Sequence, residues 1–361
     1  MTTGTLIEGL NEKMIQAKIN EIDVKPFLFA RLFPVKKINF FQWKSLMNQA
    51  GPRNVAADIS ADNASVIRKS RPRFQTAMGD LPLLTISRDK KRSEIKEYQI
   101  ALALAGDPTA TELVEYWAED VEFCFKGIQW QLEYIALALA SNAGVLSFNN
   151  ANNAAVATEF DLDYEVADEQ KKTTSIDFAN SSTADFIGTV NGAAAAGDAL
   201  GLNIKYMYAN KAEVAKIIRM DQVIKACASF AANVLDIQQV PSLEMVNSML
   251  MRQPLTNGIQ IVLVDQKVDR ELADGSFTSS NPFADNRLLF SESPVLGSTQ
   301  YSNLLNNKDT TTLRAVRAHT VVKKYGVTEP YSEVTLAEAD ALPVFDTAYR
   351  NLYYKTDATS W

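Results

Sequence analysis

The chain has 361 residues, of which 47% are hydrophobic and 22% are charged, and its net charge is −7. This composition is ordinary for a folded protein and excludes global disorder. No run of about 18 uncharged apolar residues occurs, and the first ten residues lack a basic flank and a long apolar stretch. We therefore expect no membrane span and no secretory signal, and we expect the chain to fold in a cytoplasm.

A single histidine, His319, and two cysteines, Cys124 and Cys227, limit the available chemistry. Catalytic triads and most zinc sites need imidazole. His319 lies in an alternating run over 316–322 that predicts a strand, and both cysteines have apolar neighbours, typical of small buried hydrophobes. Phosphate loops, dinucleotide-binding loops, C-x-x-C and G-x-S-x-G motifs are absent from the sequence. No cofactor is expected.

Residues 1–50 combine a short amphipathic stretch over 10–22 with many aromatic side chains. The set that we single out is Phe27, Phe29, Phe33, Phe40, Phe41 and Trp43. Aromatic side chains at this density need a surface to cover them. That surface is either the core of this chain or a neighbouring copy.

Residues 51–92 predict a long two-stranded ribbon, with strands over 66–71 and 83–88 and a tip that contains proline and glycine. Residues 68–92 contain eight basic and two acidic residues, which gives this segment a net charge of +6. The bases are Arg68, Lys69, Arg71, Arg73, Arg88, Lys90, Lys91 and Arg92. A ribbon with so few apolar residues needs something to lie on. Because Phe74 is its only aromatic residue and the rest of the chain is acidic, a protein surface is favoured over nucleic acid.

A long helix is predicted over 109–146. Thr109 and Glu112 have the spacing of a capping box, apolar residues follow at three- and four-residue intervals, and Gly144 is a suitable stop. A break near Gly127 is compatible with the pattern. The apolar stripe of this helix is expected to pack in a core.

The alternating run 160–166 predicts a strand with Asp161, Asp163 and Glu165 on one face. Carboxylates at this spacing suit a solvated strand face or a divalent metal site. Because no further oxygen ligands are placed beside them, the pattern favours the solvated face.

Residues 167–310 predict a mixed α/β body, and a further strand returns towards the C-terminus. The helices are expected over 182–200, 211–218, 221–235 and 242–250, the strands over 203–210, 258–265 and 288–290, and a long polar loop over 269–281.

The order of these parts resembles the major capsid proteins of tailed bacteriophages, which have the Hong Kong 97 fold, and more closely the lambda-type major capsid protein E family. The segments that carry the resemblance are 54–58 through 73–74, 131–140, 258–264 with 286–290, and 337–344. The resemblance implies an α+β, Hong Kong 97-type capsid fold. Its parts would be an N-terminal arm (1–50), an extended β-hairpin loop (51–105), a peripheral domain with the spine helix (106–166), an axial domain (167–310), and a return strand that completes the peripheral and axial domains (311–361).

The same resemblance implies a non-enzymatic shell protein. Copies of the chain would form pentamers and hexamers of an icosahedral virion capsid, assembled in the host cytoplasm around double-stranded DNA that is bound without sequence specificity. Scaffold, portal and decoration proteins would be further partners, with no membrane involved. The basic, acidic and aromatic side chains named above are the candidate contacts between copies. Two alternatives remain: an encapsulin-like protein compartment, and a metal-dependent enzyme that uses the acidic strand.

Overall fold

A computed structural model describes residues 2–7, 9–48, 74–105, 110–148, 153, 160–228, 239–271, 275–302 and 311–361. The chain divides into two compact units. Unit 1 comprises Met1–Trp43, Met78–Glu133 and Ser298–Val344, and unit 2 comprises Lys44–Ala77, Tyr134–Gly297 and Phe345–Trp361. Each unit is therefore assembled from segments that are far apart in the sequence.

Unit 1 is built on a seven-stranded sheet in which the long strand β17 (Tyr331–Val344) pairs with three other strands. Five strands follow the order β1 (Thr2–Thr3), β16 (Thr320–Thr328), β17 (Tyr331–Val344), β14 (Ser298–Tyr301) and β2 (Val35–Lys37). The other two are β15 (Leu313–Arg317), which pairs with β16, and β5 (Leu83–Lys91), which pairs with β17. All these pairs are antiparallel except β14 with β2. One chain end, residues 2–3, is thus held by a strand near the other end.

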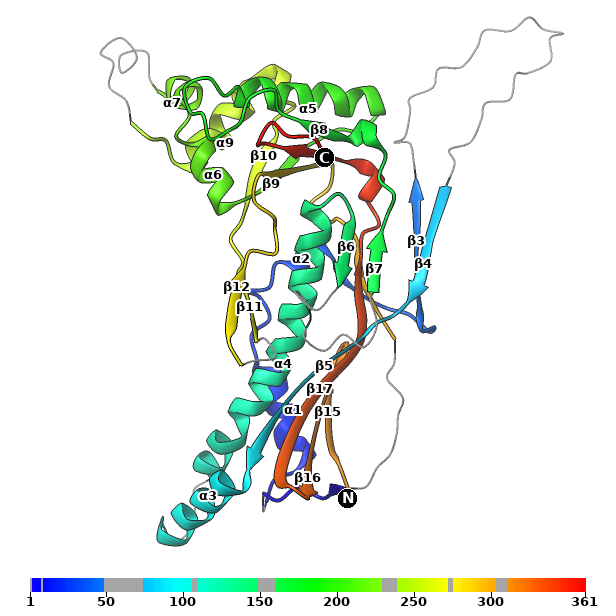
Figure 1. Ribbon diagram of the computed structural model, residues 1–361, viewed down its shortest axis with the longest axis vertical. Helices are drawn as coiled ribbons and strands as arrows, with labels where there is room; N and C mark the ends of the chain where they lie inside the picture. The colour runs from blue at the N-terminus through cyan, green and yellow to red at the C-terminus, as the bar shows by residue number, and fades with distance from the viewer. Residues whose placement is uncertain are drawn as a thin grey trace, which may run out of the picture. The chain divides into compact units, whose positions relative to one another are not determined.

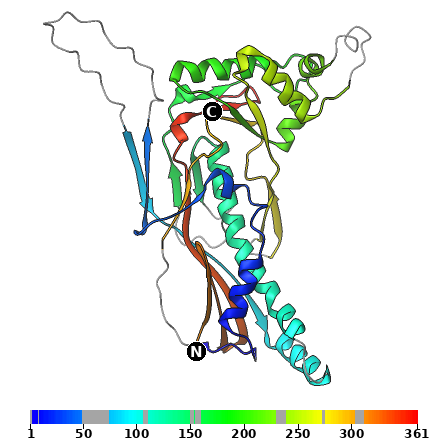
Figure 2. The same ribbon diagram turned by 180° about the vertical axis from the view of Figure 1, so that it is seen from behind.

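The helices of unit 1 are α1 (Glu12–Glu21), α2 (Phe29–Leu32), α3 (Arg92–Ala105) and the first part of α4 (Ala110–Ser141). The Asn11 side chain caps α1 by accepting from the Met14 amide, and Ile15 and Ile19, one turn apart, are fully buried. A 3.5 Å ion pair between Lys18 and Glu122 joins α1 to α4, and Figure 2 shows α1 in blue beside α4.

Helix α4 has 32 residues and runs through Gly127 without a break. A Cβ atom at Gly127 would lie 2.5 Å from the Cδ1 atom of Ile86, so the glycine makes room for strand β5. Beside it, the Cys124 thiol lies 3.4 Å from the Thr335 carbonyl oxygen. Helix α4 can approach strand β17 this closely because β17 buries small residues, including Ala337 and Ala339.

Unit 2 contains a five-stranded mixed sheet covered by helices. Its strands are, in order, β10 (Gln260–Val264), β9 (Tyr206–Asn210), β13 (Arg287–Ser291), β18 (Asn351–Lys355) and β8 (Lys171–Thr173). Its helices are α5 (Phe186–Leu200), α6 (Lys211–Ile217), α7 (Asp221–Cys227) and α9 (Leu243–Arg252), with short 3-10 turns η1 (Asp168–Gln170), η2 (Pro254–Thr256) and η3 (Ala348–Arg350). Strands and helices share one apolar core, and Figure 1 shows α5, α7 and α9 gathered around the sheet.

Three two-stranded ribbons complete the described elements. They are β3 (Gln42–Asn48) with β4 (Phe74–Asp80), β6 (Val145–Phe148) with β7 (Phe160–Asp163), and β11 (Val268–Glu271) with β12 (Phe277–Ser280). In β6–β7 the outward residues are exposed and the inward ones are buried, apart from the half-buried Phe160, which is the alternation expected of a ribbon with one solvated face.

Four details differ from the sequence-based expectations. Residues 83–88 belong to β5 and pair with β17, whereas their expected partner, 66–71, lies outside the described residues. The expected loop 269–281 is mostly the hairpin β11–β12, because its strands pair through their backbones without an apolar pattern to signal them. His319 lies in the turn between β15 and β16, where Ala318 has a φ of 51°, and not within a strand. The expected helix 221–235 is described only as α7, over Asp221–Cys227.

Candidate assembly surfaces

The basic side chains of β5 already have partners in unit 1. Lys90 Nζ lies 2.9 Å from Asp120 Oδ2, and Arg88 lies 3.0 Å from Glu119 and 3.6 Å from Asp120. The Lys90 ammonium also sits 4.6 Å above the ring of Tyr116. Because Asp120 is almost fully buried, its pairing with Lys90 offsets the cost of removing the carboxylate from water. These contacts anchor β5 to α4. Arg88 and Lys90 therefore form ion pairs within their own chain, and their role as contacts for a neighbouring copy remains a prediction.

The other six basic residues of this segment fall into two groups. Lys91 and Arg92 are exposed at the junction of β5 and α3. The remaining four, Arg68, Lys69, Arg71 and Arg73, lie outside the described residues. Their role as contacts remains a prediction.

Most of the aromatic side chains of residues 1–50 are covered by this chain itself. Phe27, Phe29, Phe33 and Trp43 are buried, and Phe27 packs edge-on against Trp130 with a centroid distance of 4.8 Å. Of the two surfaces that the sequence left open, the chain's own core is therefore the one that these four residues use. They have no exposed ring to offer a second copy.

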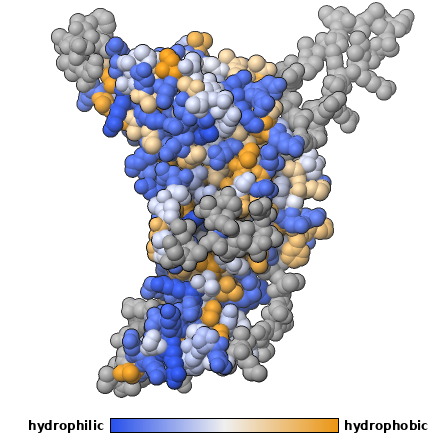
Figure 3. Space-filling view, in the orientation of Figure 1, coloured by the Kyte–Doolittle hydropathy of each residue, from blue (hydrophilic) through white to orange (hydrophobic). Residues whose placement is uncertain are grey.

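Phe40 and Phe41 behave differently. Their exposed fractions are 76% and 54%, among the larger values for the apolar residues that the structure describes. The Phe41 carbonyl accepts a 2.8 Å hydrogen bond from the Leu81 amide, so this turn has a defined backbone at the base of the ribbon β3–β4. Figure 3 shows hydrophobic residues scattered among hydrophilic ones on one side of the molecule.

Two lysines precede this pair of phenylalanines. Lys36 and Lys37 lie on β2, the last strand in the order of the unit 1 sheet, and both are exposed. Neither forms an ion pair with any residue that the structure describes. Lys36 and Lys37 are not among the predicted contact residues, although the run Lys-Lys-Ile-Asn-Phe-Phe is a visible signal of a basic and aromatic surface.

The predicted acidic strand is shorter than expected: Asp161 and Asp163 lie on β7, whereas Glu165 lies beyond its end, where φ is 50°. Asp161, Asp163 and Glu165 are exposed, whereas Leu162 and Tyr164 between them are buried. The buried Tyr164 hydroxyl accepts a hydrogen bond from the Phe345 amide at 3.0 Å. Within the described part of the chain, Asp161 and Asp163 have no ion-pair partner.

The acidic face shows no sign of a metal centre. Among the described residues no group of three or more His, Cys, Asp or Glu side chains is placed to hold an ion. Both cysteines are free thiols, and Cys124 is buried with its pKa raised to about 12 by that burial. No helix among the described residues is long and apolar enough to cross a membrane.

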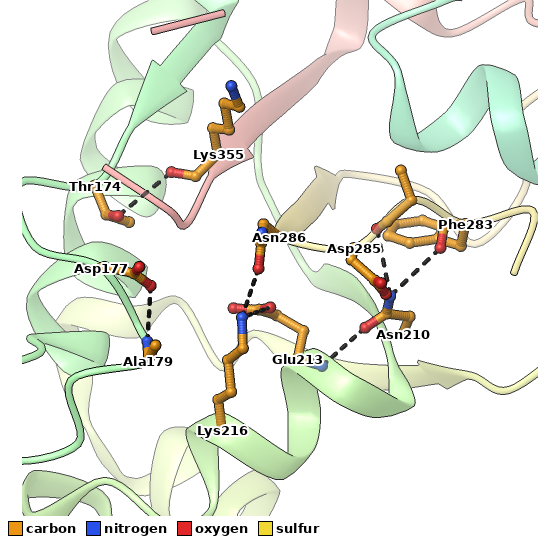
Figure 4. A network of polar contacts seen from close by, with 11 residues as sticks. Thr174, Asp177, Ala179, Asn210, Glu213, Lys216, Phe283, Asp285, Asn286 and Lys355 are labelled. Atoms are coloured by element: carbon orange, nitrogen blue, oxygen red, sulfur yellow. Dashed lines mark hydrogen bonds and ion pairs between the residues drawn. The ribbon is translucent and has the colours of Figure 1, made fainter. Parts of the chain in front are cut away.

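A network of polar contacts stabilises the loop before β13 in unit 2 (Figure 4). The Asn210 side chain caps α6 by accepting from the Glu213 amide at 2.8 Å and donates to Asp285 at 2.5 Å. Lys216 reaches the buried Glu213 carboxylate at 3.1 Å and the Asn286 side chain at 2.5 Å. These bonds connect α6 to a loop about seventy residues away in the sequence, so we assign the network a structural role.

Comparisons with known proteins support the fold. No family model and no curated protein sequence matches this chain. Among solved structures, a putative capsid protein of an Escherichia coli prophage is similar with a TM-score of 0.57 and 10% identity, over 98% of this chain and 99% of that chain. A phage-related protein from Bordetella bronchiseptica is similar with a TM-score of 0.55 and 12% identity, over 96% of this chain and 97% of that chain.

These similarities define the class of fold. The chain has an α+β, Hong Kong 97-type phage capsid fold along nearly its whole length, as the order of its sequence elements predicted. At 10–12% identity the agreement lies in the arrangement of the backbone, and sequence motifs contribute little to it.

Proposed function

We propose that this chain is the major capsid protein of a tailed bacteriophage. Copies of it would associate into pentamers and hexamers and close into an icosahedral shell around double-stranded DNA. The observation that carries the proposal is the capsid fold, whose similarity to a prophage capsid protein covers 98% of this chain and 99% of that chain.

The surface of the chain supports a role in association. Exposed apolar side chains occur on several elements, including Phe40, Met78, Met251, Leu255 and Phe277. Exposed residues of this kind are ordinary one at a time, but several large ones on a single subunit suit a protein that buries them against other copies. Many weak contacts per subunit would together stabilise a shell by multivalency.

The proposal places the protein in the virion capsid after assembly in the host cytoplasm. Scaffold, portal and decoration proteins would be its other partners. The packaged DNA would be held by enclosure, since the net charge of −7 gives little general attraction for a polyanion.

Expression of the chain followed by sedimentation and negative-stain microscopy tests the proposal. Closed particles built of many copies are expected, alone or together with a scaffold protein. A protein that stays monomeric under both conditions would contradict it. Particles that enclose an enzyme and no nucleic acid would instead identify an encapsulin-like compartment.

A further inference from the structure

We propose that a basic and aromatic edge of one copy docks on the acidic face of the β6–β7 ribbon of a second copy. The docking edge consists of Lys36, Lys37, Phe40 and Phe41. The acidic face consists of Val145, Ser147, Asp161 and Asp163. This inference rests on the proposed function, because it names the surfaces through which copies of a shell protein meet.

The first argument is charge. Lys36 and Lys37 lack ion pairs with described residues of their own chain, and so do Asp161 and Asp163. Segment 35–44 contains three lysines and no acid, whereas 159–169 contains six acids and no base. Surfaces of opposite sign steer two copies together and disfavour other orientations.

Charge alone would be weak evidence, because lysines on an edge strand are a common protection against unwanted strand pairing. That explanation does not extend to the two phenylalanines that follow them. An exposed Phe40 and Phe41 increase the tendency to associate, which is the opposite of what a protected edge requires. Lysines beside exposed aromatic rings therefore indicate selective association.

The acidic face offers an apolar counterpart. Val145 pairs directly with Asp163 in the β6–β7 register and is 39% exposed. Asp161 and Asp163 are two positions apart on one strand, so their carboxylates project from the same face about 6.7 Å apart along the strand. A second copy would thus find an apolar side chain next to two carboxylates, a combination complementary in charge and polarity to an exposed phenylalanine preceded by lysines.

Charge reversal tests this pairing. One variant carries Lys36→Glu with Lys37→Glu, a second carries Asp161→Lys with Asp163→Lys, and a third carries all four changes. All four positions are exposed, so each variant is expected to fold, which circular dichroism and thermal melting would check. The matched control is Lys13→Glu with Lys25→Glu, which makes the same charge change at exposed lysines elsewhere in the first 50 residues.

Each two-site variant should raise the protein concentration needed for particle formation by about tenfold or more, since like charges then face each other across the contact. The four-site variant, and an equal mixture of the two two-site variants, should assemble near the wild-type concentration. The control should resemble the wild type.

Normal assembly of either two-site variant would overturn the docking, as would failure of the folded four-site variant to recover. Absence of particles from the wild type contradicts the proposed function instead. In that event sedimentation compares how strongly the wild type and the variants form dimers or rings. The docking then requires the two-site variants to associate more weakly than the wild type, the four-site variant and the control.

Discussion

The Glu133 carboxylate of α4 accepts a 2.7 Å hydrogen bond from the backbone amide of Phe29, the first residue of α2. Its other oxygen accepts from the Leu28 amide at 3.1 Å. Two amides at the start of a short helix, which have no partner within that helix, are thus satisfied by one buried side chain. Through this contact α4 fixes the position of a segment that lies about one hundred residues earlier in the sequence.

Glu133 makes stability depend on pH. Burial raises its pKa to about 7 from an ordinary value of 4.5. The folded state therefore binds a proton more readily than the unfolded state, and this contribution to stability is complete below pH 4.5 and lost as pH rises through 7. The full contribution should amount to about 3–4 kcal/mol, because the shift is about 2.5 pKa units at 1.36 kcal/mol per unit. In Glu133→Gln this pH-dependent contribution to stability should disappear.

Urea unfolding of the two proteins at several pH values measures this effect. The difference in unfolding free energy between wild type and Glu133→Gln should change steadily from pH 4.5 to pH 7. A constant difference across that range would show that the Glu133 carboxyl does not titrate there.

His319 has the opposite dependence. Its Nε2 donates to the Gln129 side-chain oxygen at 3.2 Å, a role that follows because the Gln129 amide nitrogen donates to Thr320. Burial lowers the pKa of His319 to about 4 from 6.5. The unfolded state therefore binds the proton more readily, so this contribution is present above pH 6.5 and lost as pH falls towards 4.

The variant His319→Gln should remove that loss. As the pH falls from 6.5 to 4, the unfolding free energy of the variant minus that of the wild type should rise by about 2–3 kcal/mol, whatever the cost of the substitution at neutral pH. In the wild type the contributions of His319 and Glu133 oppose each other over most of this range. Equal pH profiles for the wild type and His319→Gln would contradict the prediction.

Asp120→Asn should destabilise unit 1. The change removes the carboxylate that pairs with Lys90 at 2.9 Å and leaves a largely buried ammonium without its anion. We expect a loss of about 2–4 kcal/mol, somewhat less than for a fully buried pair, measured as a shift of the urea midpoint. The control is Glu119→Gln, since Glu119 is 73% exposed where it meets Arg88, and it should cost less than about 0.5 kcal/mol. Similar costs for both variants would show that burial of Asp120 is unimportant.

Gly79→Ala should displace the indole of Trp43. A Cβ atom at residue 79 would lie 2.8 Å from Trp43 Nε1 and 3.2 Å from Cε2, and the rigid ring cannot yield locally. We expect a loss of about 1–3 kcal/mol together with a change in tryptophan fluorescence. Gly192→Ala in α5 is the control, because nothing lies within 4 Å of its Cβ position and the helix should gain up to about 1 kcal/mol. Unchanged fluorescence in Gly79→Ala would contradict this packing.

Local patterns in the sequence determined several elements correctly. The apolar spacing and capping signals predicted a helix over 109–146, and α4 covers Ala110–Ser141. The alternation of 160–166 correctly placed Asp161 and Asp163 on an exposed face, because a strand directs successive side chains to opposite sides whatever it packs against. The order of the elements was also sufficient to predict the capsid fold.

Only the tertiary structure decided which surfaces remain available. Arg88 and Phe33 look like contact residues in the sequence, yet Arg88 meets Glu119 and Asp120, and Phe33 is buried. Phe40 looks the same as Phe33 but stays exposed. The strand partner of 83–88, found in β17 some 250 residues later, could not be predicted either. Side-chain type and spacing act over one or two turns, whereas burial and pairing depend on which distant segments the fold brings alongside, and no local pattern encodes that choice.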